Sequence, residues 1–268
     1  MIRKPVRKVW SWTLCIFSVV CLIGSYTVLS DIQHRKNADD TTIPTWTQLK
    51  DGLCKVFEKN KLTGASWITT DLKASAERFF LGLAIGVAGA LIFGMLMGCF
   101  SVFESFFILP LTILALIPPT AALAVYFVLV GTNTEMYVTM IALGIGPTLA
   151  RTICLAVKDV PDELIEKSYT LGASTTEIIW DVIFKNILPK IIDAARLSIA
   201  PAMIFLIAAE MVCGDAGFGY RIRLQSRLLD MNVVYTYLAF LGIFGFVMDY
   251  LFRCISKFFC PWYQPERT

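Results

Sequence analysis

Long apolar runs constrain this chain more than any other feature of its sequence. A helix needs about 20 mostly apolar residues to cross about 30 Å of hydrocarbon. Six runs reach that length, the fifth only when the alanines before it are counted. These runs span residues 9–29, 79–100, 106–130, 136–157, 197–213 and 233–254. The sequence therefore predicts an all-α integral membrane protein with six transmembrane helices.

The composition agrees with a membrane protein and argues against other classes. Apolar residues fill 56% of the 268 positions and charged residues 17%, against about 25% charged residues in ordinary domains. The net charge of +3 is too small for a protein that binds nucleic acid by neutralising phosphates. The chain has one histidine, His34, and no C-x-x-C pair, so neither a metal nor a cofactor is expected.

The sequence also lacks the motifs of a nucleotide-binding or hydrolytic enzyme. There is no G-x-x-x-x-G-K-[ST] loop, so the chain is not expected to bind or hydrolyse ATP. The glycine-rich stretch 214–219 follows no predicted strand and precedes no Lys-Ser/Thr pair. No residue is therefore predicted to be catalytic.

Basic residues before the first run set the predicted orientation. Arg3, Lys4, Arg7 and Lys8 precede it, and positive residues near span ends are retained in the cytoplasm. Six spans then place both termini in the cytoplasm. The first run is longer than the roughly 7–15 apolar residues of a cleaved signal peptide, which favours a retained anchor.

The predicted organisation has three parts. Residues 1–30 hold the cytoplasmic N-terminus and first transmembrane helix, 31–75 form an external segment, and 76–260 form a five-helix core. In the external segment apolar residues at helical spacing predict an amphipathic helix. These residues are Trp46, Leu49, Leu53, Val56 and Phe57. Such a helix could lie in the membrane interface, pack against the bundle or dock an external partner.

Two of the apolar runs carry features of packing. In the second, small residues at every fourth position predict the close approach of another helix. They are Gly82, Gly86, Ala90, Gly94 and Gly98. In the third, Pro118, Pro119 and Thr120 lie near mid-span, where proline frees backbone carbonyls. This segment either lines the translocation pathway or forms a kink that shapes the packing.

Charged residues inside predicted spans are costly, and they mark candidate functional positions. Arg151 and Asp249 lie toward the cytoplasmic ends of their spans and are predicted to pair. Glu210 lies near the external end of the fifth span. It is a candidate for the translocation pathway or, alternatively, a hydrogen-bonded anchor near the mouth.

The one long segment predicted in the cytoplasm, 158–193, has the pattern of a helical hairpin. Its apolar residues form two short amphipathic helices with a break between them. Asp159 is expected to cap the first helix, and Pro161 is expected in its first turn. The break is expected at Gly172-Ala173, and Ser174 or Thr175 is expected to cap the second helix. A polar hairpin on a membrane bundle is typical of a docking element.

Several ordered motifs resemble one family of membrane proteins. In the cytoplasmic segment they are Glu166-Lys167-Ser168, Gly172-Ala173-Ser174, Val182-Ile183 and Ile187-Leu188-Pro189. Elsewhere they are Asp71 with Ser75 and Arg78, Leu116-Ile117-Pro118-Pro119-Thr120, Ala208-Ala209-Glu210 and Gly217-Phe218-Gly219-Tyr220. The first set is similar to the EAA loop of binding-protein-dependent ABC importer permeases. Together, across about residues 71–263, they resemble the nitrate/sulfonate/taurine/bicarbonate branch of that family.

The resemblance implies a type I importer fold in the cytoplasmic (inner) membrane, and a multi-pass transport subunit that carries a small anionic solute. It implies partners: two cytoplasmic ABC ATPase subunits, an external substrate-binding protein and a second permease chain, expected to form a homodimer. It also implies that the loop forms a coupling helix seated on the ATPase. The residues carried over to that role are Glu166, Lys167, Ser168, Tyr169, Leu171, Gly172, Ala173 and Ser174.

This sequence departs from the family pattern at two places. Lys167-Ser168 replace the usual Ala-Ala, and Phe184-Lys185 stand where Leu-Pro is often found.

Two other functions have their own sequence requirements. An ion-driven secondary transporter would need mid-span acidic or histidine relays and paired inverted repeats. A membrane-embedded enzyme would need clustered histidines, cysteines or carboxylates at one membrane face. The sequence favours neither alternative.

Overall fold

The computed structural model describes residues 8–36, 41–58 and 64–263, and the chain is built from helices. The first helices are α1 (Lys8–Lys36), α2 (Trp46–Phe57), α3 (Trp67–Cys99), α4 (Ser101–Leu116), α5 (Leu123–Val130) and α6 (Thr134–Lys158). The later ones are α7 (Asp162–Thr170), α8 (Thr175–Glu177), the π-helix η1 (Ile178–Phe184), α9 (Lys185–Leu197), α10 (Ile199–Cys213), α11 (Phe218–Arg227) and α12 (Met231–Phe259). The chain divides into two compact units, Met1–Trp67 with Leu224–Leu238, and Ile68–Arg223 with Ala239–Thr268.

Five helices within the described residues are long and apolar enough to cross a membrane, in agreement with an all-α membrane protein. They are Trp12–Lys36, Trp67–Cys99, Thr134–Lys158, Thr175–Cys213 and Met231–Phe259. Each contains one of the predicted runs or most of it. The remaining run, 106–130, is divided between α4 and α5. Ile117 is extended, with φ −82° and ψ 115°, because the residue before a proline is disfavoured in the α conformation.

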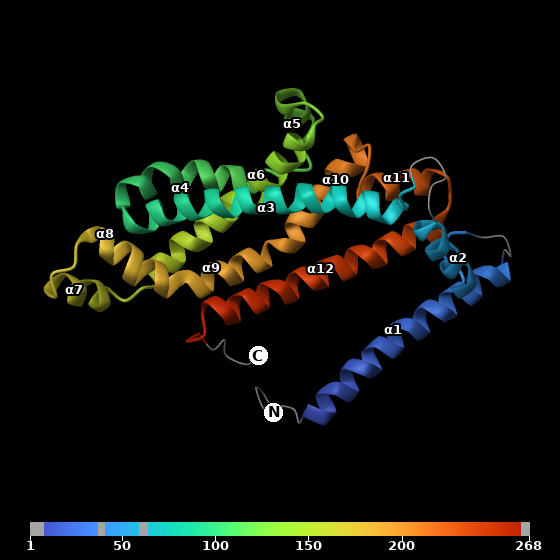
Figure 1. Ribbon diagram of the computed structural model, residues 1–268, viewed down its shortest axis with the longest axis horizontal. Helices are drawn as coiled ribbons and strands as arrows, with labels where there is room; N and C mark the ends of the chain where they lie inside the picture. The colour runs from blue at the N-terminus through green and yellow to red at the C-terminus, as the bar shows by residue number, and fades with distance from the viewer. Residues whose placement is uncertain (1–7, 37–40, 59–63, 264–268) are drawn as a thin grey trace. The chain divides into compact units, whose positions relative to one another are not determined.

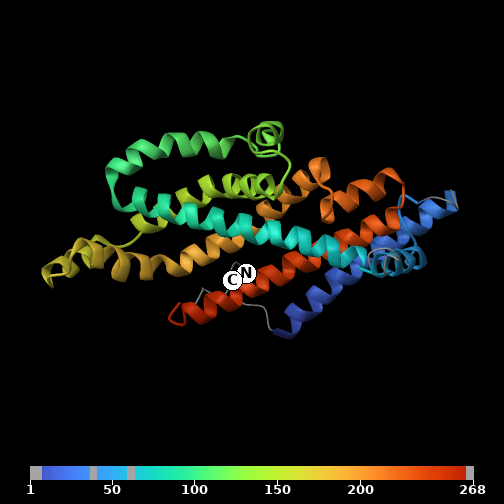
Figure 2. The ribbon, with the colours of Figure 1, turned by 45° about the horizontal axis from the view of Figure 1, so that its top comes forward.

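In the larger unit, α6 lies at the centre and packs against α4, α5, α9 and α10. Figures 1 and 2 show α3 reversing into α4, which runs back along it. The buried apolar side chains form two clusters. One joins α3 and α6 to η1 and α9 around Met97, Ile153, Ile178 and Ile187. The other joins α3 and α6 to α10 around Phe79, Tyr137, Ile141 and Leu206.

The row of small residues on α3 packs closely against another helix, as predicted, and that helix is α6. A Cβ atom on Gly82 would lie 2.7 Å from Cβ of Ile141, and one on Gly98 would lie 2.5 Å from Cβ of Val157. Gly86 likewise faces Ile145. The two helices therefore approach each other more closely than larger side chains would allow, which is how helices associate in a membrane.

We expect Gly94→Ala to destabilise the protein by about 1–3 kcal/mol, because the methyl group would be overpacked. A Cβ there would lie 2.7 Å from Cβ of Ile153 and 2.8 Å from the carbonyl oxygen of Ala150. Gly89→Ala on the same helix is the control, since no atom lies within 4 Å of its Cβ position. The measurement is the thermal unfolding midpoint in detergent. Equal midpoints for the two variants would contradict the close α3–α6 contact.

The predicted pair between Arg151 and Asp249 is not formed. Asp249 on α12 instead binds Arg196 of α9, with 3.1 Å between Nε and Oδ1, and Arg253 one turn along, with 2.8 Å between Nε and Oδ2. Arg151 is exposed and makes no ion pair within the described part of the chain. The prediction was wrong because depth alone was compared, whereas pairing also depends on which face of each helix the side chain occupies.

Candidate functional site

The segment 158–193 forms a helical hairpin followed by a long helix. Helix α7 begins after Pro161, which occupies the N-cap position with φ −61° and gives no side-chain cap. Asp159 does not cap α7, contrary to expectation. It ends α6 instead, and its carboxylate accepts a hydrogen bond from Nζ of Lys190 at 2.8 Å. The hairpin is therefore tied to α9 at its base.

The predicted turn at Gly172 is confirmed. Gly172 has φ +87°, a conformation that glycine adopts without the steric cost of a Cβ atom. The amide of Gly172 donates to the carbonyl of Tyr169 at 3.0 Å, and that of Ala173 donates to the carbonyl of Ser168 at 3.1 Å. These bonds satisfy carbonyls at the C-terminal end of α7.

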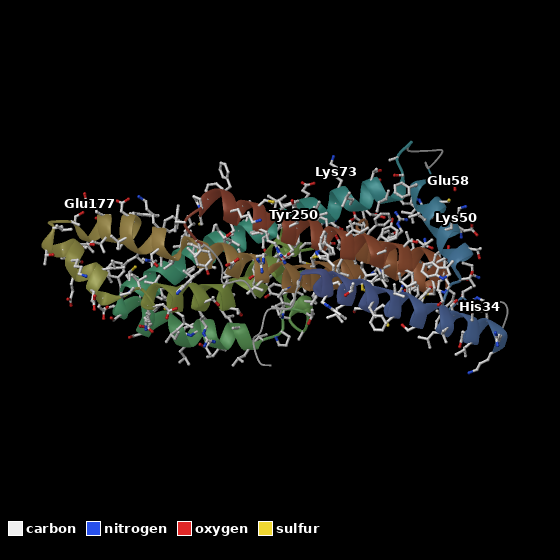
Figure 3. All side chains as sticks on the ribbon, turned by 90° about the horizontal axis from the view of Figure 1, so that it is seen from below. His34, Lys50, Glu58, Lys73, Glu177 and Tyr250 are labelled. Atoms are coloured by element: carbon white, nitrogen blue, oxygen red, sulfur yellow. The ribbon has the colours of Figure 1, made fainter. Side chains whose placement is uncertain are left out.

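Of the two predicted caps, Ser174 and Thr175, the structure has Ser174 at the N-cap of the helix after the turn. Its Oγ accepts from the amide of Glu177, and the Glu177 carboxylate accepts from the amide of Ser174 at 2.7 Å. This reciprocal pair is a capping box. In Figure 3, Glu177 lies at the end of the larger unit that is formed by the hairpin.

Ser174→Ala should destabilise the first turn of this helix by about 1 kcal/mol, because it removes the cap from the Glu177 amide. The readout is amide hydrogen exchange over residues 175–178, which should become faster. Thr176→Ala, an exposed change on the same turn, is the control and should leave the exchange rates unaltered. Unchanged exchange in Ser174→Ala would show that the capping box contributes nothing.

The surface of the hairpin combines charge with one prominent apolar side chain. Leu171 at the turn is 87% exposed, and Tyr169 on α7 is 50% exposed. Glu166 and Lys167 are exposed beside them. Ser168 is half-buried, and its Oγ donates to the carbonyl of Leu164 at 2.7 Å. An apolar group held out on a charged hairpin fits docking to another protein.

A cavity of about 260 Å³ lies between the hairpin and the ends of α3 and α6. Its lining includes Gly98, Lys158, Tyr169 and Thr175. The hairpin contacts the bundle through apolar side chains at its base, such as Ile165. Directly after it comes the seven-residue π-helix η1, a geometry often found at functional sites. Its last residue, Phe184, belongs to the Phe184-Lys185 departure from the family pattern.

A second polar site lies at the beginning of α3 and the end of α10. Ser75 and Arg78 project from α3 toward Glu210 of α10, whose side chain is fully buried. Oγ of Ser75 donates to Oε1 of Glu210 at 2.8 Å, and Nη1 of Arg78 lies 3.1 Å from the same atom. The Arg78 guanidinium also stacks 4.1 Å from the ring centroid of Tyr137.

The glycine-rich stretch 214–219 closes this buried cluster with backbone amides. The amide of Gly217 donates to Oδ1 of Asp71 at 3.1 Å, and that of Gly219 donates to Oε2 of Glu210 at 2.9 Å. Gly217 has φ +119°, and a Cβ there would overlap the Glu210 carboxylate. Nε of Arg221 completes the arrangement, 2.8 Å from Oδ2 of Asp71. The stretch is a carboxylate-binding loop within the protein.

The structure brings some predicted site residues together and separates others. Glu210 makes its hydrogen bonds to protein groups and is closed off from solvent, which agrees with the anchor alternative. Pro118 and Thr120 are exposed in the break between α4 and α5, and Pro119 is half-buried against Gly144 of α6.

Sequence reasoning missed that Ser75 and Arg78 meet Glu210, and that Asp71 binds the loop 214–219 beside them. The available signal was their i, i+4, i+7 spacing, which places these three polar groups on one face of the helix.

Comparison with known proteins agrees with this architecture. The chain is 26% identical to the taurine transport system permease protein of Escherichia coli over 72% of this chain and 70% of that protein. It is 23% identical to a putative aliphatic sulfonates transport permease protein of Bacillus subtilis over 97% of this chain and 91% of that protein. A chain of the inward-facing MetNI methionine ABC transporter shares the fold, with a TM-score of 0.62 and 21% identity over 70% of this chain and 94% of that one.

The family model matches most of the membrane core. Residues 90–260 match the model of the binding-protein-dependent transport system inner membrane component. The matched region contains α4 to α10, the hairpin and Glu210. In this family ATP hydrolysis belongs to a partner, so the chain is a multi-pass transport subunit of the membrane. The chain belongs to the family of inner-membrane components of binding-protein-dependent transport systems, the permeases of ABC importers.

Proposed function

We propose that this permease carries a small anion of the taurine, sulfonate, nitrate or bicarbonate type, and that residues 166–174 couple it to a cytoplasmic ATPase. The geometry of the hairpin supports the coupling role. Its turn is fixed by Gly172, its second helix is capped by Ser174, and Leu171 is held out at 87% exposure. A partner with an apolar cleft can bury that side chain and pair with the charges of Glu166 and Lys167.

The substrate class rests on the named relatives. The two permeases reported above are named for taurine and aliphatic sulfonates, both small sulfonated solutes. Translocation in this proposal passes the exposed break at Pro118, Pro119 and Thr120. Glu210 instead acts as a buried anchor that fixes the loop 214–219.

The proposed assembly has two copies of this chain, two ATPase subunits and an external binding protein. Reconstitution of that assembly in proteoliposomes tests the function. Uptake of radiolabelled taurine, an alkanesulfonate, nitrate and bicarbonate is measured with and without ATP and with and without the binding protein. We expect uptake of at least one of these anions that needs both components. Uptake driven by an ion gradient without ATP would support the secondary-transporter alternative instead.

The proposed orientation places both termini and the hairpin in the cytoplasm. Cys54 on α2 is exposed and would then face outside. A membrane-impermeant maleimide added to intact cells should label the chain, and Cys54→Ser should remove most of that label. Labelling of Cys54 only after the membrane is permeabilised would invert the orientation.

A further inference from the structure

Helix α2 carries a row of apolar side chains that are exposed. Trp46 is 53% exposed, Leu53 43% and Phe57 55%. At about 100° per residue these three positions fall within a sector about 40° wide. The row therefore forms one continuous stripe, which we call the α2 stripe.

The other residues of α2 divide into two further faces. Gly52 and Val56 are buried, and they lie on the side of α2 next to the stripe. Asp51 and Lys55 are exposed on the side farthest from it. Lys50 lies at the edge of the stripe and, like Glu58, projects outward from α2 in Figure 3. A helix that rests on protein, lipid and water at once needs three such faces.

The contacts between α1 and α2 fix the depth of α2 along the first span. Oη of Tyr26 donates to the carbonyl of Pro44 at 2.6 Å, and Oγ of Ser30 donates to the same carbonyl at 3.3 Å. Tyr26 and Ser30 bracket the end of the apolar run 9–29, after which Asp31 begins a charged stretch. Helix α2 therefore begins where α1 leaves the hydrocarbon.

The start of α12 gives the same depth independently. A Cβ on Gly52 would lie 2.7 Å from the backbone of Asn232, so α2 rests directly on the first turn of α12. Nζ of Lys55 pairs with Oδ2 of Asp230 at 3.1 Å. The apolar run of α12 begins at residue 233. Both spans thus change from charged to apolar at the level of α2.

We propose that the α2 stripe lies in the interfacial zone of the lipid bilayer, with Trp46, Leu53 and Phe57 at the boundary of the acyl chains. Amphipathic helices bury their apolar face about 5–10 Å into that boundary, and Trp and Tyr gather there. The ring centroids of Trp46 and Tyr26 lie 5.5 Å apart, and those of Tyr26 and Tyr235 of α12 lie 6.1 Å apart. Lys50, at the edge of the stripe, can extend its ammonium to the headgroups.

Photo-crosslinking in the full chain tests this proposal. p-Benzoylphenylalanine is placed at Leu53, in the stripe, or at Asp51, on the face toward water, and the chain is reconstituted in vesicles of phosphatidylethanolamine and phosphatidylglycerol. After irradiation, mass spectrometry should find phospholipid adducts on the α2 peptide at position 53 and several-fold fewer at position 51. Protein adducts at position 53, or equal lipid adducts at both positions, would overturn the proposal.

Fluorescence quenching provides a second test that needs no unnatural residue in the stripe. The Trp46 signal is the difference between the natural chain and Trp46→Phe. Lipids brominated near the headgroup should quench this signal more strongly than lipids brominated near the acyl terminus. No quenching by either lipid, or stronger quenching by the deep bromine, would contradict an interfacial position. Neither test depends on which solute is transported or on ATPase coupling.

Discussion

Transport is expected to fall to background when Gly172 is replaced by proline, while the chain is still inserted in the membrane. Proline holds φ near −65°, whereas Gly172 has φ +87°. Proline also removes the amide that donates to Tyr169, and it disfavours the conformation of Leu171, which has φ −83° and ψ 0°. The turn cannot form, so Leu171 loses the position in which the proposed coupling presents it to the ATPase.

A matched control exists at the end of α5. Gly131 has φ +86°, and its amide donates to the carbonyl of Phe127 at 3.0 Å, so proline causes the same local conflict there. ATPase subunits should co-purify in detergent with Gly131→Pro and be lost from Gly172→Pro. Gly172→Ala should show a partial loss, since a left-handed non-glycine residue costs about 1–2 kcal/mol. Full ATP-coupled uptake by Gly172→Pro would disprove the coupling assignment.

Removal of the Glu210 carboxylate should cause the largest loss of stability. Breaking a buried ion pair on one side costs about 3–5 kcal/mol, because the remaining charge is left buried without its partner. In Glu210→Ala, Arg78 would keep a side chain that is only 10% exposed and lose its contact with Oε1. The amide of Gly219 would lose its acceptor as well. The thermal unfolding midpoint in detergent should fall sharply.

Asp215 provides the comparison, because it binds the same guanidinium at the surface. Nη2 of Arg78 lies 3.2 Å from Oδ1 of Asp215, whose side chain is 89% exposed. Exposed pairs contribute about 0–1 kcal/mol, so Asp215→Ala should change the midpoint little. Glu210→Gln keeps the shape and one acceptor oxygen, and its midpoint should lie between the two. Equal midpoints for Glu210→Ala and Asp215→Ala would refute the assignment of Glu210 as an anchor.

Local features of this chain could be predicted from sequence because their causes are local. The turn at Gly172 and the cap at Ser174 depend on residues within three or four positions. The packing of α3 on α6 followed from residue size at a fixed period. The proline break was also visible in the sequence, although its effect was larger than a kink, since it separates α4 from α5.

The charged contacts could not be predicted in the same way. Ser75 and Glu210 are 135 positions apart, and nothing in either segment states which faces of α3 and α10 meet. Asp249 likewise pairs with Arg196, which lies before the predicted fifth span, 197–213. Partners across a bundle depend on helix rotation and tilt, and these are set by packing as a whole.

One helix connects the two sites of this protein. Thr175–Cys213 is continuous through η1, α9 and α10, and at about 1.5 Å per residue it is roughly 58 Å long. The capped turn at Ser174 is at one end, and Glu210 is at the other. In the proposed coupling, an axial push on the hairpin would therefore be transmitted along this helix to the carboxylate-binding loop. This helix can bend at Pro189 and at the junction between α9 and α10 at Ser198.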